Sequence, residues 1–149
     1  MVAALDPPVG RMQLVAKRDE TTEYDGEEYA LATNRWESGA GEPKGYLNIE
    51  SFRLDGTTPV WRFEIADALI EKRVWMQHGE NTTYVRYTLL RGRGPLELQC
   101  TPFFNYRGFH SSTHAVHWPR DIAALKIGGW VTACGSHPAL SPFSAQPSV

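Results

Sequence analysis

The stretch from residue 58 to residue 101 constrains the fold most, because short alternations of apolar and polar residues are separated there by turn-forming residues. In its first segment Trp61, Phe63 and Ile65 alternate with charged residues, which is the period-two pattern of a strand with one buried face. Further strand-like segments cover residues 69–76, 84–89 and 96–101. Strands joined by short turns predict an antiparallel meander, so we expect an all-β fold.

Turn signals support this interpretation and extend it toward the N-terminus. Asp25-Gly26 and Asp55-Gly56 both lie between strand-like flanks, and glycine accepts the positive φ of a tight hairpin turn. Segments rich in strand-breaking residues predict two more turns, at 77–81 and 91–95. We expect a loop at 34–44, a strand at 45–54 and at most one or two helical turns at 121–127.

The same alternation predicts which side chains form the core. The apolar members of the alternating runs are expected to be buried: Trp61, Phe63, Val85, Tyr87, Leu89, Leu96 and Leu98. The residues between them are expected on the opposite, solvated face: Arg62, Glu64, Arg86 and Glu97.

Composition limits the classes of function. At 149 residues and a net charge of −2, the chain is expected to form one domain without a field that favours nucleic acid or an anionic membrane. No apolar run approaches the ~20 residues of a membrane helix, and no basic and apolar leader opens the sequence. Cys100 and Cys134 cannot form a disulfide framework, which favours reduced thiols in a cytoplasmic protein.

The residues that could do chemistry form no self-contained active site. A glycosidase needs two carboxyl groups facing each other across a sugar, whereas Glu64, Glu71 and Glu97 occupy strand positions where a solvated face is the usual environment. The histidines at 110, 114 and 117 lack a convincing carboxylate or thiolate partner, so we expect no metal site. No phosphate-binding or cofactor motif is present, and no cofactor is expected.

Five blocks that follow one another along the chain carry a resemblance to a known family: PPVGRMQLVAKRDET (7–21), EYALATNRW (28–36), GYLNIESFRLDGTTPVWRFEI (45–65), EKRVWMQHGENTTYVRYTLL (71–90) and FFNYRGFHSSTHA (103–115). Together they resemble the N-terminal domain of the bacterial and archaeal type of glycogen debranching enzyme, an amylo-α-1,6-glucosidase. In that family the N-terminal domain is a large antiparallel β-sandwich of the supersandwich kind. A C-terminal (α/α)6 barrel carries the catalytic carboxylates.

The resemblance implies a β-sandwich, whole or incomplete, over residues 1–116, and a glycoside hydrolase as the parent enzyme. The parent would hydrolyse α-1,6-glucosidic branch points in glycogen, and the sandwich would be its non-catalytic part, inactive alone. Its expected partners are the catalytic (α/α)6 domain and the α-glucan. Two alternatives remain open, namely a stand-alone carbohydrate-binding β-sandwich and a gene fragment that has lost its function.

The chain also departs from the family pattern. Family members have a further stretch before residue 2, and an acidic residue commonly stands where this chain has Gly108. The resemblance ends near residue 116, so we expect residues 117–149 to be a poorly ordered tail from outside the family, as in a truncated or frameshifted gene product.

The candidate site combines Asn105, Tyr106, Arg107 and His110, which bring aromatic, cationic and hydrogen-bonding groups together after the last strand of the stretch. The resemblance implies that this motif faces the catalytic barrel, where Arg107 would pair with a carboxylate. The alternative is an arginine that caps its own sheet edge. Trp36, in the loop rich in glycine and proline, is a further candidate on the substrate side.

Overall fold

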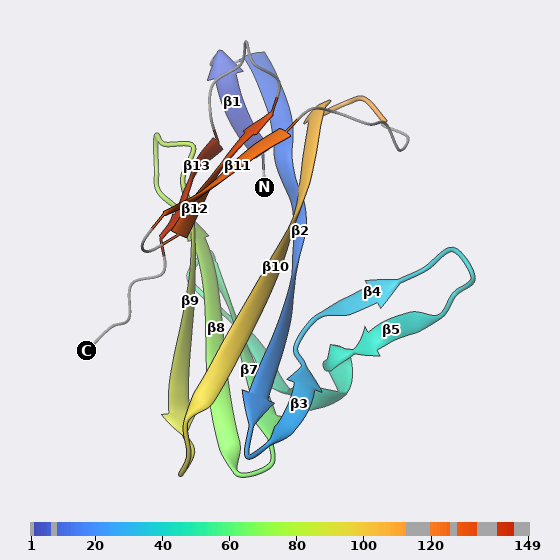
Figure 1. Ribbon diagram of the computed structural model, residues 1–149, viewed down its shortest axis with the longest axis vertical. Helices are drawn as coiled ribbons and strands as arrows, with labels where there is room; N and C mark the ends of the chain where they lie inside the picture. The colour runs from blue at the N-terminus through green and yellow to red at the C-terminus, as the bar shows by residue number, and fades with distance from the viewer. Residues whose placement is uncertain (1, 7–8, 113–119, 126–127, 134–139, 145–149) are drawn as a thin grey trace.

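The computed structural model describes residues 2–6, 9–112, 120–125, 128–133 and 140–144, and it consists of antiparallel sheets (Figure 1). One sheet contains β1 (Val2–Asp6), β2 (Val9–Tyr24), β3 (Glu27–Ala30) and β10 (Leu96–Gly108). A second contains β6 (Ile49–Asp55), β7 (Thr58–Ile65), β8 (Ala68–Met76) and β9 (Thr83–Arg91). The two sheets face each other as the layers of a sandwich, which confirms the predicted fold class.

Smaller elements flank the sandwich. The hairpin of β4 (Thr33–Arg35) and β5 (Gly41–Lys44) projects to one side and leads into a 3-10 turn, η1 (Gly45–Asn48). A three-stranded sheet combines β11 (Arg120–Leu125), β12 (Gly128–Ala133) and β13 (Leu140–Ser144). The predicted loop at 34–44 is therefore wrong at both of its ends, where β4 and β5 pair. The predicted helical turns at 121–127 are wrong for the residues of β11, which form a strand paired with β12.

The predicted meander is correct for β6 to β9 but not for the segment that follows. β10 leaves that sheet and pairs with β2, in a register that runs from Leu96 opposite Tyr24 to Gly108 opposite Met12. The turn after β9 therefore carries the chain from one sheet to the other, and β10 crosses over the second sheet (Figure 1). This switch creates the two layers, because β2 and β10 together form most of the first sheet.

The predicted hairpin turns are in place. Asp25 and Gly26 have φ values of 54° and 77°, and Gly56 has a φ of 60°, so these positions adopt the left-handed conformation that Asp-Gly pairs accommodate. The strand expected at 45–54 begins only at Ile49, because Gly45 starts the 3-10 turn. Close packing requires glycine at position 45, because an added Cβ would lie 2.3 Å from the carbonyl oxygen of Ala32.

The core lies between the sheets. Its buried members are Tyr24, Leu31, Phe63, Ile65, Ala68 and Ile70, with Trp61, Tyr87, Leu96 and Leu98 packed against them and partly buried. Val85 is half-buried, and Glu64, Arg86 and Glu97 are exposed as predicted, while Arg62 is half-buried. The prediction for Leu89 is wrong, because β9 is an edge strand whose last four residues are all exposed.

The pair Ile70 and Leu89 offers a direct test of this core. The two residues are neighbours across β8 and β9, but Ile70 is 1% exposed and Leu89 is 42% exposed. We expect Ile70→Ala to lower the free energy of unfolding by about 2–5 kcal/mol, because it leaves a cavity, and Leu89→Ala to lower it by less than about 1 kcal/mol. Urea denaturation measures both variants, and equal losses would contradict the assignment of Ile70 to the core and of Leu89 to the exposed sheet edge.

Candidate functional site

The sequence-predicted site residues at the end of β10 are held by their own loop. Arg107 Nη1 donates to the carbonyl oxygens of Gly108, Phe109 and Ser111, with a distance of 3.1 Å to Phe109. The exposed ring of His110 meets the Phe109 ring edge-on, at 5.1 Å between centroids. Asn105 is half-buried, and the side chain of Tyr106 lies outside the described residues. These contacts fit the alternative of an arginine that caps its own sheet edge, and the pairing of Arg107 with a catalytic domain stays a prediction.

Trp36 is not part of that group. Its side chain is 56% exposed at the end of the β4–β5 hairpin, which projects away from the sandwich well below the end of β10 (Figure 1). The structure therefore separates the predicted site residues into a group at the end of β10 and in the loop that follows, and an exposed indole on the hairpin. Of the histidines considered for metal binding, His114 and His117 lie outside the described residues.

A polar cluster between the two sheets was missed by sequence reasoning. The Glu20 carboxylate on β2 accepts hydrogen bonds from Lys72 Nζ of β8 at 2.7 Å, from the Tyr87 hydroxyl of β9 at 2.6 Å and from Arg18 Nε at 3.2 Å. Glu20 is 2% exposed, so this charge is stabilised by its three partners rather than by water. Burial, together with the nearby Glu20 charge, raises the pKa of Tyr87 above its usual value, which keeps this phenol protonated as a donor.

Next to this cluster is a groove of about 250 Å³, which we call the β2 groove. Its polar wall is a triad of side chains from β2 and β4, namely Lys17, Asp19 and Asn34. Lys17 Nζ donates to Asp19 Oδ2 at 2.9 Å and to Asn34 Oδ1 at 2.6 Å, and Asn34 Nδ2 donates to Asp19 Oδ2 at 2.9 Å. Ile49, Trp61 and Phe63 line the groove as its apolar members on the second sheet.

The carboxylates of the β2 groove are suited to binding rather than to acid catalysis. Burial alone would raise the pKa of Asp19, but the hydrogen bonds from Asn34 and Lys17 lower it below its usual value. Asp19 is therefore ionised at neutral pH and cannot act as a general acid, and Glu20 already accepts three hydrogen bonds. The groove can offer a fixed set of donors and acceptors to a ligand.

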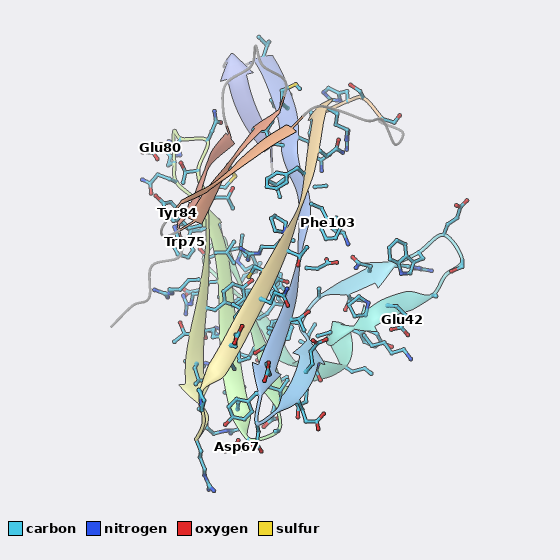
Figure 2. All side chains as sticks on the ribbon, viewed as in Figure 1. Glu42, Asp67, Trp75, Glu80, Tyr84 and Phe103 are labelled. Carbon is cyan, nitrogen blue, oxygen red and sulfur yellow. The ribbon has the colours of Figure 1, made fainter. Side chains whose placement is uncertain are left out.

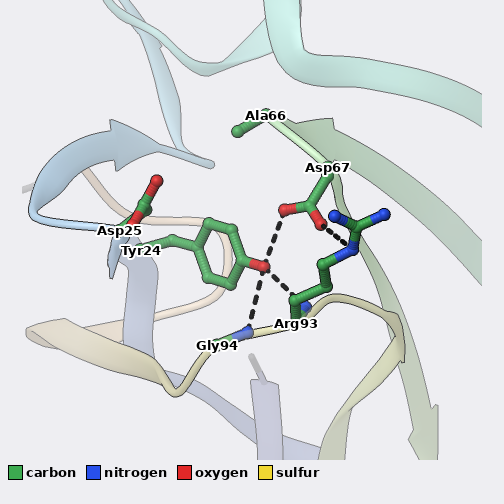
Figure 3. Close-up of a pocket in the computed structure, with 6 residues that line it drawn as sticks. All are labelled: Tyr24, Asp25, Ala66, Asp67, Arg93 and Gly94. Carbon is green, nitrogen blue, oxygen red and sulfur yellow. Dashed lines mark hydrogen bonds and ion pairs between the residues drawn. The ribbon is translucent and has the colours of Figure 1, made fainter.

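A second pocket, of about 600 Å³, lies at the end of the sandwich where three turns meet (Figure 3). The hydroxyl of the buried Tyr24 donates to Asp67 Oδ1 at 2.8 Å and accepts from the backbone N–H groups of Arg93 at 2.9 Å and Gly94 at 3.3 Å. Through these bonds the Tyr24 hydroxyl links the turn after β7 to the turn before β10. We interpret this pocket as a structural junction.

The outer face of the second sheet carries an arginine cluster. Glu71 is 7% exposed and forms ion pairs with Arg73 at 2.7 Å, Arg53 at 3.2 Å and Arg62 at 3.4 Å. On the neighbouring part of this face the Trp75 and Tyr84 rings stack at 5.4 Å (Figure 2). The hydrogen bond from Arg73, with those from Arg53 and Arg62, lowers the pKa of Glu71 despite its burial.

The described residues contain neither a candidate metal centre nor a candidate membrane helix. Among them there is no group of three or more histidine, cysteine, aspartate or glutamate side chains placed to hold a metal ion. A search of the same residues finds no helix with the length and apolar character needed to cross a bilayer. Fold and site together define a β-sandwich domain in which described polar side chains form ion pairs between and on the sheets and line two pockets.

Comparison with known proteins identifies the family to which this sandwich belongs. The family described as glycogen debranching enzyme N terminal matches residues 1–146, nearly the whole chain, so the chain belongs to this family. No curated protein and no solved structure matches it. The match continues to residue 146, whereas the resemblance found in the sequence ends near residue 116. The division of the chain at residue 116 stays a prediction.

The lowered pKa of Glu71 predicts how stability depends on pH. Because folding lowers this pKa from its ordinary value of 4.5, the stabilisation is fully present above about pH 4.5 and is lost as the pH falls through the folded-state pKa. We expect Glu71→Gln to be less stable than the unmodified chain at pH 7, by about 1–3 kcal/mol, because three arginines lose their shared anion. The difference should shrink toward pH 3.

Urea denaturation at pH 7, 5, 4 and 3 measures this convergence. Glu64→Gln is the matched control, since Glu64 lies on the same face and pairs with Arg91 at 2.6 Å while both side chains are about half exposed. A destabilisation by Glu71→Gln that stays constant from pH 7 to pH 3 would contradict the assignment.

Proposed function

We propose that this chain acts as the non-catalytic N-terminal domain of a glycogen debranching enzyme. The parent enzyme hydrolyses α-1,6-glucosidic branch points in glycogen or a related α-glucan, and the site of action is the cytoplasm. The observation that carries the proposal is the family match over residues 1–146. In this proposal the reaction takes place on a separate catalytic (α/α)6 domain, and the sandwich supports that domain or its substrate.

The chemistry of the described carboxylates supports a non-catalytic role. Glycoside hydrolysis requires one carboxyl group that stays protonated to donate to the leaving oxygen and a second that acts as base or nucleophile. In the β2 groove Asp19 has a lowered pKa and Glu20 is bonded to two cations and a phenol, so neither serves as the acid. Glu71 is likewise held ionised, by three arginines, on the outer face.

A partner domain would also explain the exposed apolar surface along β6. Phe52 and Leu54 are 56% and 63% exposed, although both point to the core side of their strand. Tyr46 and Leu47 of the preceding 3-10 turn are exposed as well. Neighbouring apolar side chains of this size are typical of a surface that packs on another domain. We propose the catalytic (α/α)6 domain as the partner of this surface.

A second candidate function is a stand-alone carbohydrate-binding sandwich. The β2 groove favours it, because an indole and a hydrogen-bonded polar triad line the same cavity. Sugar rings place C–H faces on aromatic rings and hydroxyl groups on polar side chains, so such a groove needs no second domain to bind them. The two functions differ in whether the chain contributes to hydrolysis when it is joined to a barrel.

The experiment that tests the proposal is glucose release from a branched limit dextrin. Three proteins are compared: this chain alone, a family catalytic barrel alone, and the chain joined to that barrel. We expect no turnover by the chain alone, because its described residues offer no protonated acid opposite a second carboxylate, and greater turnover by the fusion than by the barrel.

Two results would contradict the proposal in different ways. Clear turnover by the purified chain alone would show that it is catalytic. A barrel that is equally active with and without the chain would show that the chain contributes nothing to the reaction. Leu54→Asp in the fusion tests the docking surface, and we expect it to reduce the gain in turnover without unfolding the exposed strand.

A further inference from the structure

The first sheet has a gap along one edge of β2. β10 pairs along the opposite edge, whereas this edge pairs with β1 up to Gln13, at one end of β2, and with β3 from Thr21 onward, at the other end (Figure 1). The carbonyl of Glu20 accepts from two N–H groups of the loop after β3. Within the part of the chain that the structure describes, no strand pairs with residues 14–19 on this edge.

The backbone of β2 directs hydrogen-bonding groups into this gap. Alternate residues of a strand direct their N–H and C=O groups to the same edge, so Arg18 points the same way as Glu20. On the edge that β10 covers, Arg18 lies opposite Pro102, which has no N–H to donate. Residues 14–19 span about 20 Å at about 3.3 Å per residue. Because β1 and β3 bound the gap at both ends, it has room for one extended segment but not for the edge of a folded sheet.

Apolar side chains of the second sheet lie uncovered beside this gap. Trp61 is paired in register with Phe52 on one side and with Lys72 on the other, so the three form one row on the core side of the sheet. The contact of Lys72 with Glu20, at 2.7 Å, places this row at the end of the gap nearest β3. Phe52 is nevertheless 56% exposed, and Leu54, the next residue on the same face of β6, is 63% exposed. The first sheet therefore stops short of β6.

The uncovered side chains follow the direction of the gap. β2 contacts the turn before β8 through Tyr24 and the middle of β8 through Glu20. The path from Tyr24 to Glu20 therefore runs along β8 away from that turn, and Leu54, opposite Pro59, lies further along in the same direction. The β2 groove, which Trp61 lines, opens here. Neighbouring strands lie about 4.8 Å apart, so a strand added to the uncovered edge of β2 would lie over β7 and cover the core side of β6.

We propose that this gap binds an extended segment of a partner polypeptide, which joins the first sheet as an added strand. β1 and β3 pair with this edge in the antiparallel sense, and the added strand continues their line. Its apolar residues, at alternate positions, cover Trp61, Phe52 and Leu54, and the residues between them face solvent. The inference deepens the docking proposed for this surface, because it names the form in which the partner's chain binds, and to that extent it rests on the proposed function.

Titration of the ¹⁵N-labelled chain with a blocked octapeptide, Thr-Val-Thr-Val-Thr-Val-Thr-Lys, tests this site by NMR shifts and amide hydrogen exchange. We expect saturable shifts at the amides of residues 14–19 and at the Trp61 indole N–H. Exchange of the Arg18 amide should slow about tenfold or more, because the added strand bonds to it. A peptide of the same composition with adjacent valines, Thr-Thr-Val-Val-Val-Thr-Thr-Lys, should bind about tenfold more weakly, because adjacent side chains point to opposite faces of a strand.

Two exposed leucines on the two edge strands of the second sheet provide matched variants. Leu54→Asp places a charge under the added strand and should weaken peptide binding about tenfold or more, whereas Leu90→Asp, on β9, should leave it unchanged. Circular dichroism and the amide spectrum establish that each variant is folded, and Phe52→Ser keeps the test valid if Leu54→Asp is unstable. Binding that survives both Leu54→Asp and Phe52→Ser, shifts that saturate at β9 instead, or equal binding of the two peptides would each overturn the proposal.

The same octapeptide joined to the N-terminus gives a second measurement that does not depend on its affinity in solution. β1 reaches the gap with Val2 opposite Gln13, so an extension of the chain continues along this edge of β2. Two extensions are compared, with the valines offset by one residue, because only one frame turns them toward the second sheet. We expect that frame alone to raise the Tm in thermal denaturation. No rise in either frame, or an equal rise in both, would contradict the proposal.

The outcome is distinct from that of the proposed function. A chain that raises turnover in the barrel fusion but does not bind the octapeptide at residues 14–19 retains the accessory role and loses this site. A chain that binds the octapeptide there but leaves the turnover of the barrel unchanged retains the site and loses the accessory role.

Discussion

The arrangement of the two sheets depends on one buried carboxylate. Glu20 lies on β2 in the first sheet, and it accepts hydrogen bonds from Lys72 of β8 and Tyr87 of β9 in the second. Removing a carboxylate from water costs several kcal/mol, and this cost is offset only when all the partners are in place. One relative setting of the sheets therefore satisfies Glu20. That setting also brings Trp61 and Lys72 of the second sheet to the pocket that Lys17, Asp19 and Asn34 line, so the β2 groove is a consequence of the same contact.

Part of the fold was predictable because its signals are local. The Asp25-Gly26 and Asp55-Gly56 turns need only a positive φ that these residues accommodate, and the alternation through Phe63 and Ile65 identifies a buried face directly. The passage of β10 to the other sheet could not be predicted in this way. Leu96 and Leu98 show the same alternation in either sheet, and only their pairing with Tyr24 and Thr22, far away in the sequence, decides between them.

The candidate site was harder to predict for the same reason. The run Lys17-Arg18-Asp19-Glu20 resembles a solvated strand, yet alternate members point to opposite faces, and Glu20 meets Lys72 and Tyr87 at sequence separations of 52 and 67 residues. The available signal was that each of its two cations is followed, two residues later on the same face, by an anion. Arg107 and Trp36 were chosen by residue type; in the structure Arg107 donates to carbonyl groups of its own loop, and Trp36 is exposed on the hairpin.

The central claim is that the Glu20 contact between the sheets sets the geometry of the domain, and a double-mutant cycle tests it most directly. Glu20→Gln, Lys72→Met and the double variant are compared with the unmodified chain by urea denaturation at pH 7. If the two side chains act as one inter-sheet contact, the double variant will be more stable than the sum of the single losses predicts, by at least about 1 kcal/mol. Additive losses, within about 0.3–0.5 kcal/mol, would contradict the claim.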